Sequence, residues 1–359
     1  MASLDFHKLR VAEVKRETPD AVSVRFDLPE ELRETFKFRA GQHLTLRREI
    51  GGEEVRRNYS VCVAPHENML KVGVKQIAGG LFSGWVNAEL KAGDIVEVMA
   101  PHGSFCWTFE PEARREYVGF AGGSGITPVL SLMKAALSLE PRSRFTLIYG
   151  NRTSLGVMFL EEIAALKDRY LDRLQVFHFL EDEEEEIELF NGRLDRPKVE
   201  QILSSVVDPS LVDAFFICGP GPMMDAIEET LLARGVEKSK LLIERFTTGP
   251  LSAAQAAAAR ALEEKAAGRK MSVTLNGRRM NVSFDPDKHS ILDNVRAAGL
   301  PAPFACKGGV CATCRAKVTA GEVSMKVNYG LSEEELAEGY VLTCQATPLN
   351  DDVALTYDA

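Results

Sequence analysis

Four cysteines near the carboxyl end constrain this chain more than any other feature. Cys306, Cys311 and Cys314 follow a C-x4-C-x2-C spacing, and Cys344 stands alone further along. Soft thiolate sulfurs suit tetrahedral iron, and this spacing is typical of a loop that holds a [2Fe–2S] cluster. Gly308-Gly309 can take positive φ angles and let backbone N–H groups approach the sulfurs. The sequence therefore predicts a centre that carries one electron at a time.

Two other uses of the cysteines fit the pattern less well. Zinc sites usually pair two short C-x2-C clips, whereas this chain has one clip and an uneven x4 spacing. A disulfide framework belongs to an oxidising compartment, and the first residues do not look like a signal peptide. The expected location is a reducing cytoplasm. Cys62, Cys106 and Cys218 stand singly among apolar residues, so they are expected to be small buried hydrophobes.

Length and composition limit the class of protein. A chain of 359 residues predicts two or three domains, and 45% hydrophobic residues are enough for a core in each. The net charge of −9 argues against nucleic acid or an anionic membrane as the main partner. No apolar run approaches the length of a membrane span, so no membrane association is expected.

The first 113 residues read as short strands separated by glycine turns. The segments 22–26, 43–46 and 70–74 alternate apolar and polar residues. Many short strands with regular turns predict an antiparallel β-barrel over residues 1–113.

Residues 114–247 have a different pattern of apolar residues. Apolar runs at 117–121, 145–150, 174–180, 214–218 and 241–246 alternate with helical stretches such as 158–170 and 223–233. This alternation predicts an α/β domain with a parallel sheet. The acidic run 181–186 is expected to be a solvated connection.

The remaining chain divides into a linker and a small domain. Residues 253–267 are mostly alanine, which predicts a semi-rigid helical linker over 248–270 that contributes little to any core. Residues 271–359 predict an α+β domain with an Asn276-Gly277 hairpin. Its helices are expected after Ser290 and after a Ser332/Glu335 capping box.

The barrel contains two segments suited to a flavin nucleotide. In Arg57-Asn58-Tyr59-Ser60, arginine suits a pyrophosphate, tyrosine can lie flat on an isoalloxazine ring, and serine can hydrogen-bond a ring nitrogen. Gly79-Gly80-Leu81-Phe82-Ser83 predicts an anion site at a helix N-terminus. Each segment alone would equally fit an ordinary strand or turn, but the pair is more specific.

The parallel sheet contains two glycine turns suited to a second nucleotide. Gly122-Gly123-Ser124-Gly125-Ile126-Thr127-Pro128 follows the first strand and lacks the full G-x-G-x-x-G fingerprint. It predicts a tight turn with Thr127 as N-cap and Pro128 at the first helical position, where a pyrophosphate would fit. Cys218-Gly219-Pro220 ends a later strand at the same edge of the sheet.

Together these motifs resemble the ferredoxin–NADP⁺ reductase superfamily. The resemblance rests on Arg57-x-Tyr59-Ser60, Gly79-Gly80-x-x-Ser83, Gly123-x-Gly125-x-x-Pro128 and Cys218-Gly219-Pro220. The segments 306–318, 149–152 and 328–329 are similar to those of the reductase components of phenylacetyl-CoA monooxygenases (epoxidases). The resemblance spans nearly the whole chain. It implies an FAD-binding barrel, an NAD(P)-binding α/β domain and a β-grasp ferredoxin domain.

The resemblance also implies roles at the flavin. Arg57 and Ser83 would contact the flavin pyrophosphate, next to the Gly79-Gly80 turn. Tyr59 would stack on the flavin ring, and Ser60 would touch its N5 atom. FAD is expected rather than FMN, because these motifs match the FAD-binding members.

At the nicotinamide, Thr127 and Cys218 would flank the ring. Phe246 would cover the flavin until the nicotinamide displaces it. Arg152 lies just beyond a sheet strand, where a 2′-phosphate would bind, and no acidic residue is adjacent to claim a 2′-hydroxyl. This favours NADPH and leaves NADH as the alternative donor. The alternative role for Arg152 is an ion pair with the acidic residues of a neighbouring loop, for instance those near Glu181.

The resulting hypothesis is an electron-transfer reductase that passes electrons from NADPH through FAD and a [2Fe–2S] cluster. The resemblance implies the oxygenase component of a multicomponent monooxygenase as acceptor, expected to be a di-iron enzyme acting on phenylacetyl-CoA. A Rieske-type oxygenase such as a ketosteroid hydroxylase is the alternative acceptor. A second class is a non-catalytic redox sensor that binds flavin and cluster.

Overall fold

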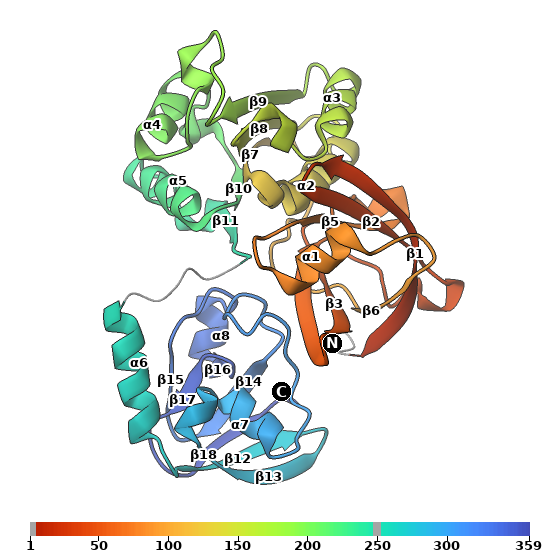
Figure 1. Ribbon diagram of the computed structural model, residues 1–359. Coiled ribbons are helices and arrows are strands. Elements are labelled where there is room, and N and C mark those ends of the chain that lie inside the picture. The colour runs from red at the N-terminus through yellow and green to blue at the C-terminus, as the bar shows by residue number, and fades with distance from the viewer. Residues whose placement is uncertain (1–4, 247–252) are drawn as a thin grey trace. The chain divides into compact units, whose positions relative to one another are not determined.

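A computed structural model describes residues 5–246 and 253–359. The chain divides into two compact units, one ending at Glu244 and the other starting at Arg245. Figure 1 labels the helices and strands of both units. Across the described residues, no helix combines the length and the apolar character needed to cross a membrane.

The first unit begins with an antiparallel sheet of six strands in the order β4-β3-β6-β1-β2-β5. These strands are β1 (Phe6–Thr18), β2 (Ala21–Asp27), β3 (His43–Ile50), β4 (Glu53–Ser60), β5 (Leu70–Lys75) and β6 (Ile95–Met99). An antiparallel bridge between Val61 and Val72 joins the continuation of β4 to β5, which brings the two edges of the sheet together. Helix α1 (Leu81–Ala88) packs Phe82 into the enclosed core. The predicted antiparallel β-domain is confirmed.

The second sheet of this unit is parallel, with the order β11-β10-β7-β8-β9. Its strands are β7 (Glu116–Gly122), β8 (Arg144–Asn151), β9 (Leu174–Leu180), β10 (Ala214–Cys218) and β11 (Leu241–Glu244). Its helices are α2 (Ile126–Leu139), α3 (Leu160–Arg169), α4 (Arg196–Ser205) and α5 (Gly221–Ala233). Helices α2 and α3 pack on one face, and α4 and α5 on the other (Figure 1). Burial on both faces explains why these strands are continuously apolar.

The strand order places a switch point between β7 and β10. The chain leaves β7 through α2 to reach β8 on one side, and β10 lies on the other side. In open α/β sheets, ligands bind at the carboxyl ends of the strands beside such a point. The turns after Gly122 and after Cys218 both lie there.

The second unit contains a mixed five-stranded sheet, β13-β12-β18-β14-β16, and a two-stranded sheet, β15-β17. The strands are β12 (Lys270–Leu275), β13 (Arg278–Ser283), β14 (Arg315–Ala320), β15 (Val323–Met325), β16 (Tyr340–Leu342), β17 (Ala346–Pro348) and β18 (Val353–Thr356). The helices are α6 (Ala253–Lys265), α7 (Ile291–Ala297) and α8 (Glu333–Ala337). Asn276 and Gly277 have φ angles of 53° and 70°, as the predicted type I′ hairpin requires.

The alanine-rich segment is helical as predicted, and it contributes little to a core, as expected, except at its end. Ala266, just after α6, is fully buried in the core of the second unit. The buried Glu263 accepts from Lys326 at 2.5 Å and from His289 at 2.9 Å. These ion pairs hold the carboxyl end of α6 against the rest of the second unit. Residues 248–252 of the predicted linker lie outside the described residues.

Candidate functional site

Strand β4 carries the three residues predicted to face the flavin, Arg57, Tyr59 and Ser60. It pairs with β3, where His43 lies opposite Ser60. Ser60 is only 2% exposed, and its hydroxyl has no hydrogen-bond partner among the described residues. Leaving a buried polar group unpaired costs about 1–3 kcal/mol. This hydroxyl therefore fits a polar ligand atom, as a flavin ring nitrogen would provide.

The neighbours of Ser60 also suit a flavin nucleotide. The exposed Arg57 donates to the carbonyl oxygen of Arg56 at 2.7 Å, and no described carboxylate forms an ion pair with it. Burial raises the pKa of Tyr59, against the opposing charge of Arg57, so its phenol is neutral. Its ring centroid lies 5.8 Å from that of Phe82. A guanidinium without a described ion-pair partner beside a half-buried neutral ring matches a pyrophosphate and a flat apolar ring system.

The turn at Gly79-Gly80 is closed by Ser83. Gly79 has a φ of 71°, and Gly80 is the N-cap of α1. The Ser83 hydroxyl accepts from the Ile77 N–H at 3.1 Å and donates to the Gly80 carbonyl oxygen at 3.4 Å. The hydroxyl is thus used within the turn, and the first N–H groups of α1 are the groups available to an anion.

The glycine turn after β7 starts its helix earlier than predicted. Thr127 is not the N-cap and Pro128 is not the first helical residue; Gly125 is the N-cap and α2 starts at Ile126. The reason is that the turn Gly123–Gly125 is already a 3-10 helix, whose last residue has helical dihedral angles. Pro128 is still tolerated, because N–H groups in the first turn have no intrahelical partner.

The turns after β7 and β10 touch each other. A Cβ atom on Gly125 would lie 2.0 Å from the carbonyl oxygen of Cys218, and one on Gly219 would lie 3.0 Å from the Cα of Gly122. Only residues without a side chain allow this approach. Cys218 is fully buried, and burial together with the Glu244 charge raises the pKa of its thiol. A neutral thiol therefore lies at the predicted nicotinamide position.

The start of α2, after the glycine turn 122–125, packs against β5 of the antiparallel sheet. The Thr127 hydroxyl donates to the Ser124 carbonyl oxygen at 2.9 Å, and a Cβ on Gly73 of β5 would lie 2.7 Å from Thr127 Cγ2. Pro220 is the N-cap of α5 and packs against Gly122. Phe246 is 36% exposed and lies beyond β11, which ends at Glu244 rather than at the predicted residue 246.

Arg152 pairs with an acidic residue near Glu181, as the alternative role expected from the sequence requires. Its Nε and Nη2 atoms donate to Asp182 Oδ2 at 3.0 and 2.8 Å, although its side chain is 80% exposed. Glu183 accepts from the N–H and the hydroxyl of Ser154 at 2.9 and 3.1 Å. The expectation that no acidic residue is adjacent is therefore wrong. The acidic run returns to the end of β8, which places Asp182 beside Arg152.

Two further polar residues at this site were not among the predicted site residues. Both amide atoms of Asn151 are buried without a hydrogen bond among the described residues, although the Tyr149 phenol lies near. His43 is buried with Nδ1 3.8 Å from Glu244 Oε1 and Nε2 3.2 Å from Asn58 Nδ2. Burial and the neighbouring His102 lower the pKa of His43. Only the pairing of β3 with β4 identifies His43 as a neighbour of the flavin strand.

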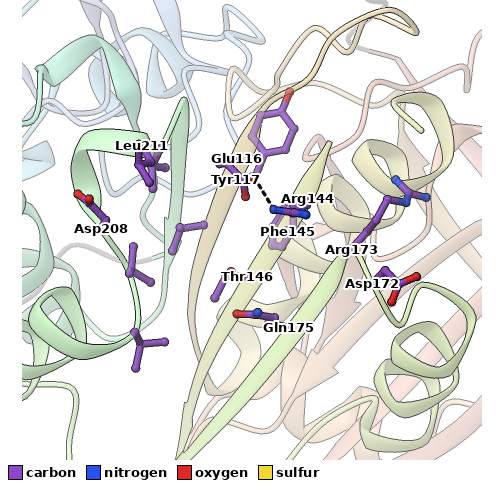
Figure 2. Close-up of a pocket in the computed structure, with 14 residues that line it drawn as sticks. Glu116, Tyr117, Arg144, Phe145, Thr146, Asp172, Arg173, Gln175, Asp208 and Leu211 are labelled. Atoms are coloured by element: carbon purple, nitrogen blue, oxygen red, sulfur yellow. Dashed lines mark ion pairs between the residues drawn. The ribbon is translucent and has the colours of Figure 1, made fainter. Parts of the chain in front are cut away.

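A separate cavity of about 440 Å³ lies at the opposite edge of the parallel sheet. Its lining includes Glu116 and Arg144, the first residues of β7 and β8, whose side chains form an ion pair at 3.6 Å. Figure 2 shows this pair among the residues that line the cavity. The cavity therefore lies at the amino ends of the strands, away from the two glycine turns.

In the second unit, the four predicted cluster ligands form two pairs. The thiols of Cys306 and Cys311 are within hydrogen-bonding reach of each other, as are those of Cys314 and Cys344. Donation from Cys306 lowers the pKa of Cys311 well below its ordinary value, and donation from Cys314 lowers the pKa of Cys344. Each pair thus brings two sulfurs close enough to share a hydrogen bond.

Several N–H groups point at the cysteine sulfurs. Gly308 N–H donates to Cys306 Sγ at 3.2 Å, Cys306 N–H to Cys311 Sγ at 3.5 Å, and Gln345 Nε2 to Cys344 Sγ at 3.6 Å. The contact from Gln345 carried no sequence signal of its own. Such donors stabilise negative sulfur and tune a cluster's potential.

The paired arrangement fits a two-iron centre. Cys306 lies beside Cys311, and Cys314 lies beside Cys344. A [2Fe–2S] cluster takes four cysteine thiolates shared between two irons. Two thiol pairs surrounded by N–H donors are the chemistry that such a cluster needs.

Comparison with known families matches three successive regions. The oxidoreductase FAD-binding domain family matches residues 8–107, the oxidoreductase NAD-binding domain family matches residues 120–229, and the 2Fe-2S iron-sulfur cluster binding domain family matches residues 273–349. These matches confirm the predicted cofactor classes: FAD, a nicotinamide nucleotide and a [2Fe–2S] cluster.

Curated relatives resemble the chain along its whole length. One component of the 1,2-phenylacetyl-CoA epoxidase of Escherichia coli (strain K12) is 43% identical over 354 residues, which cover 99% of this chain and 98% of that protein. The ferredoxin reductase component of 3-ketosteroid-9-alpha-monooxygenase from Rhodococcus rhodochrous is 33% identical over 356 residues, covering 97% and 96%. The solved structure of phthalate dioxygenase reductase aligns with a TM-score of 0.58 at 21% identity and covers 98% of both chains, which supports the fold.

Proposed function

Because the chain belongs to the ferredoxin–NADP⁺ reductase superfamily, among the oxygenase reductases with a carboxyl-terminal [2Fe–2S] domain, we propose that it supplies electrons from NADPH to a phenylacetyl-CoA epoxidase. The observation that carries this proposal is the 43% identity to the E. coli epoxidase component over 99% of the chain. The proposed acceptor is the di-iron oxygenase component of that system.

The proposed flavin contacts come from β4 and α1. FAD and the cluster, when bound, convert the two electrons of a nicotinamide into single-electron transfers. Arg57 would bind the FAD pyrophosphate with its guanidinium, which forms no ion pair with a described carboxylate, helped by the N–H groups that follow Gly79-Gly80. Tyr59 would cover the flavin ring, and the Ser60 hydroxyl would find in a ring nitrogen the partner that it lacks.

The proposed nucleotide contacts come from the touching turns. The N-terminus of α2, preceded by Gly123 and Gly125, would bind the nucleotide pyrophosphate. Thr127 and Cys218 would flank the nicotinamide. Cys218 would contribute an apolar wall, since burial keeps its thiol neutral. Gly219-Pro220 would complete the turn, and Phe246 would cover the flavin until the nicotinamide displaces it.

The proposed cluster ligands are Cys306, Cys311, Cys314 and Cys344. Their thiolates would each bind iron, and the N–H groups of Gly308 and Gln345 would offset negative charge on sulfur. All seven cysteines of the chain are free of disulfides, which supports the reducing cytoplasm as the proposed location.

Reconstitution separates the candidate acceptors. The purified chain should oxidise NADPH in step with epoxide formation when mixed with the phenylacetyl-CoA epoxidase oxygenase. The alternative acceptor, a ketosteroid oxygenase, is favoured by the 33% identity to a ketosteroid monooxygenase reductase component. Product formation only with that oxygenase would replace the proposed acceptor.

A redox sensor would behave differently. It would fail to reduce ferricyanide or cytochrome c in repeated turnovers, whereas the proposed reductase should oxidise NADPH steadily with either acceptor. The three matched cofactor domains in one chain support the reductase.

A further inference from the structure

One face of α2 is polar, although it is buried. Thr127, Ser131 and Lys134 are spaced i, i+4 and i+7, which places them on the same side of the helix. All three are buried. Thr127 of this face lies against Gly73 of the barrel, and the other two residues also contact segments of the barrel.

Ser131 links the helix to the flavin strand through two hydrogen bonds. Its hydroxyl donates to the Val63 carbonyl oxygen at 2.6 Å and accepts from the Gly41 N–H at 3.4 Å. Val63 follows Ser60 by three residues on the continuation of β4. One hydroxyl thus connects the segment that carries the flavin residues to the helix that carries Thr127.

Lys134 provides the second link between α2 and the barrel, through a chain of ion pairs. Its ammonium lies 3.1 Å from Glu67 Oε2 and also pairs with Glu162 of α3. Glu162 pairs in turn with Lys71 of β5 at 3.2 Å. Glu67 accepts from the Ala64 N–H at 2.5 Å, so the ammonium reaches the same segment as Ser131. Two positive and two negative groups therefore join the barrel to the helices of the parallel sheet.

We propose that Ser131 and Lys134 are positioning residues that fix the nicotinamide turn relative to the flavin strand. This inference rests on the proposed function and adds to it the residues that set the approach of the two rings. Ser131 and Lys134 contact neither proposed ring site. They would fix the position of Thr127 on one side, and of the segment from Tyr59 to Val63 on the other.

The polar nature of this interface supports a role beyond stability. Apolar side chains of similar volume often hold two lobes together as well as a buried ion pair does. Hydrogen bonds and ion pairs have narrow preferred distances and angles, so they restrict sliding between packed surfaces. Displacement of about 1 Å between reacting groups can slow a reaction by about 10²-fold. An interface that fixes alignment is therefore suited to transfer between two stacked rings.

Ser131→Ala is the primary test, with Thr230→Ala as the matched control. Thr230 is also a fully buried helical hydroxyl, but it donates to the Ala226 carbonyl oxygen within α5. In stopped-flow mixing with NADPH and no oxygenase, Ser131→Ala should reduce its flavin about tenfold more slowly. Its NADP⁺ affinity, from the flavin difference spectrum, should change less than twofold, and Thr230→Ala should match wild type.

Amide hydrogen exchange supplies a readout that does not depend on turnover. Exchange in residues 39–43 and 61–67 should accelerate in Ser131→Ala and stay unchanged in Thr230→Ala. If Ser131→Ala exchanges faster there but reduces its flavin at the wild-type rate, the contact is structural only and the inference fails. If wild type itself is not reduced by NADPH or NADH, the proposed function fails instead.

Lys134 is tested by Lys134→Met with Lys134→Arg as the conservative variant. The methionine variant should slow flavin reduction about tenfold at unchanged FAD content, and arginine should restore at least half of the wild-type rate. If both variants lose FAD or fail to fold, Glu162→Gln tests the same ion-pair network with a smaller change. A wild-type rate of flavin reduction in Glu162→Gln would then overturn the role of Lys134.

Discussion

The two units prepare for their cofactors in opposite ways. In the first unit, polar groups at the candidate site remain without partners among the described residues, namely the Ser60 hydroxyl and the Asn151 amide. In the second unit, the candidate ligands satisfy one another, because Cys306 pairs with Cys311 and Cys314 with Cys344. The flavin–nucleotide site thus offers single buried polar atoms to a ligand, whereas the cluster site offers four thiols arranged in two pairs.

This difference predicts how each site should respond to amino-acid substitutions. A site with unpaired buried groups gains hydrogen bonds when its ligand binds, so single substitutions should weaken binding by graded amounts. A four-thiolate site gains its bonds through the metal, so loss of one ligand should abolish the centre. Substitutions in each unit can test this contrast, and their effects should decrease from the cluster loop to the ion pairs.

Replacing Cys344 by serine should have the largest effect and should be confined to the second unit. We expect loss of cluster absorbance, iron and labile sulfide with full retention of FAD, because Cys344 belongs to the unit that starts at Arg245. Absorbance spectra with iron and sulfide analysis check this. Wild-type protein should hold two irons and two sulfides, as a [2Fe–2S] cluster requires, and zinc in their place would refute the cluster assignment.

Removing residues 248–359 should leave the first unit functional. We propose that residues 1–247 fold alone, since both sheets have their own cores within residues 5–244. A chain stopped after Thr247 should bind FAD and reduce ferricyanide, but should reduce cytochrome c poorly. Thermal unfolding and FAD content provide the control, and a fragment that unfolds or loses FAD would show that the units depend on each other.

Arg152→Ala should have a graded effect on the first unit. A charge-assisted contact with a 2′-phosphate contributes about 1.5–3 kcal/mol, or roughly one to two orders of magnitude in NADPH efficiency. NADH should be unaffected. Asp182→Asn should raise NADPH efficiency by a smaller factor, because the exposed ion pair that competes for Arg152 is worth about 0–1 kcal/mol. An unchanged NADPH/NADH ratio in Arg152→Ala would remove this residue from the nucleotide site.

Lowering the pH should reduce the free energy of unfolding of both units. This is the smallest of the expected effects. Burial would raise the pKa of Glu162, but Lys134 and Lys71 hold it below the ordinary value; Lys326 and His289 do the same for Glu263. Each carboxylate therefore stabilises the fold above its unfolded pKa of about 4.5 and loses this contribution as pH falls through the lower folded value. Denaturant melts from pH 7 to 3 should show a shallower decline in Glu162→Gln, and parallel curves would contradict this.

The sequence predicted the architecture because its signals were local. Strands β9 and β10 follow directly from apolar runs, and the hairpin at Asn276-Gly277 from its turn residues. The cysteine loop was predictable for the same reason, since spacing alone carries the information.

What the sequence could not show depends on contacts between distant segments. The sequence left two partners open for Arg152, a 2′-phosphate or the acidic residues near Glu181, and only the return of the loop after β9 to the end of β8 identifies Asp182 as its contact. The buried end of α6 needs Lys326 as partner for Glu263, and alanine composition gives no sign of it. The start of α2 was misplaced because glycine propensities do not reveal a preceding 3-10 turn.

The contact between Gly125 and the Cys218 carbonyl limits how this turn can vary in evolution. A side chain at position 125 would meet a backbone atom at 2.0 Å, so β10 itself would have to move. Gly123 of the same turn has open space around it but a φ of 51°. Asparagine and aspartate enter that left-handed region at low cost. In a saturation library position 123 should therefore accept these two residues, while position 125 should accept none, so two glycines of one turn that look equivalent in sequence differ in mutational tolerance.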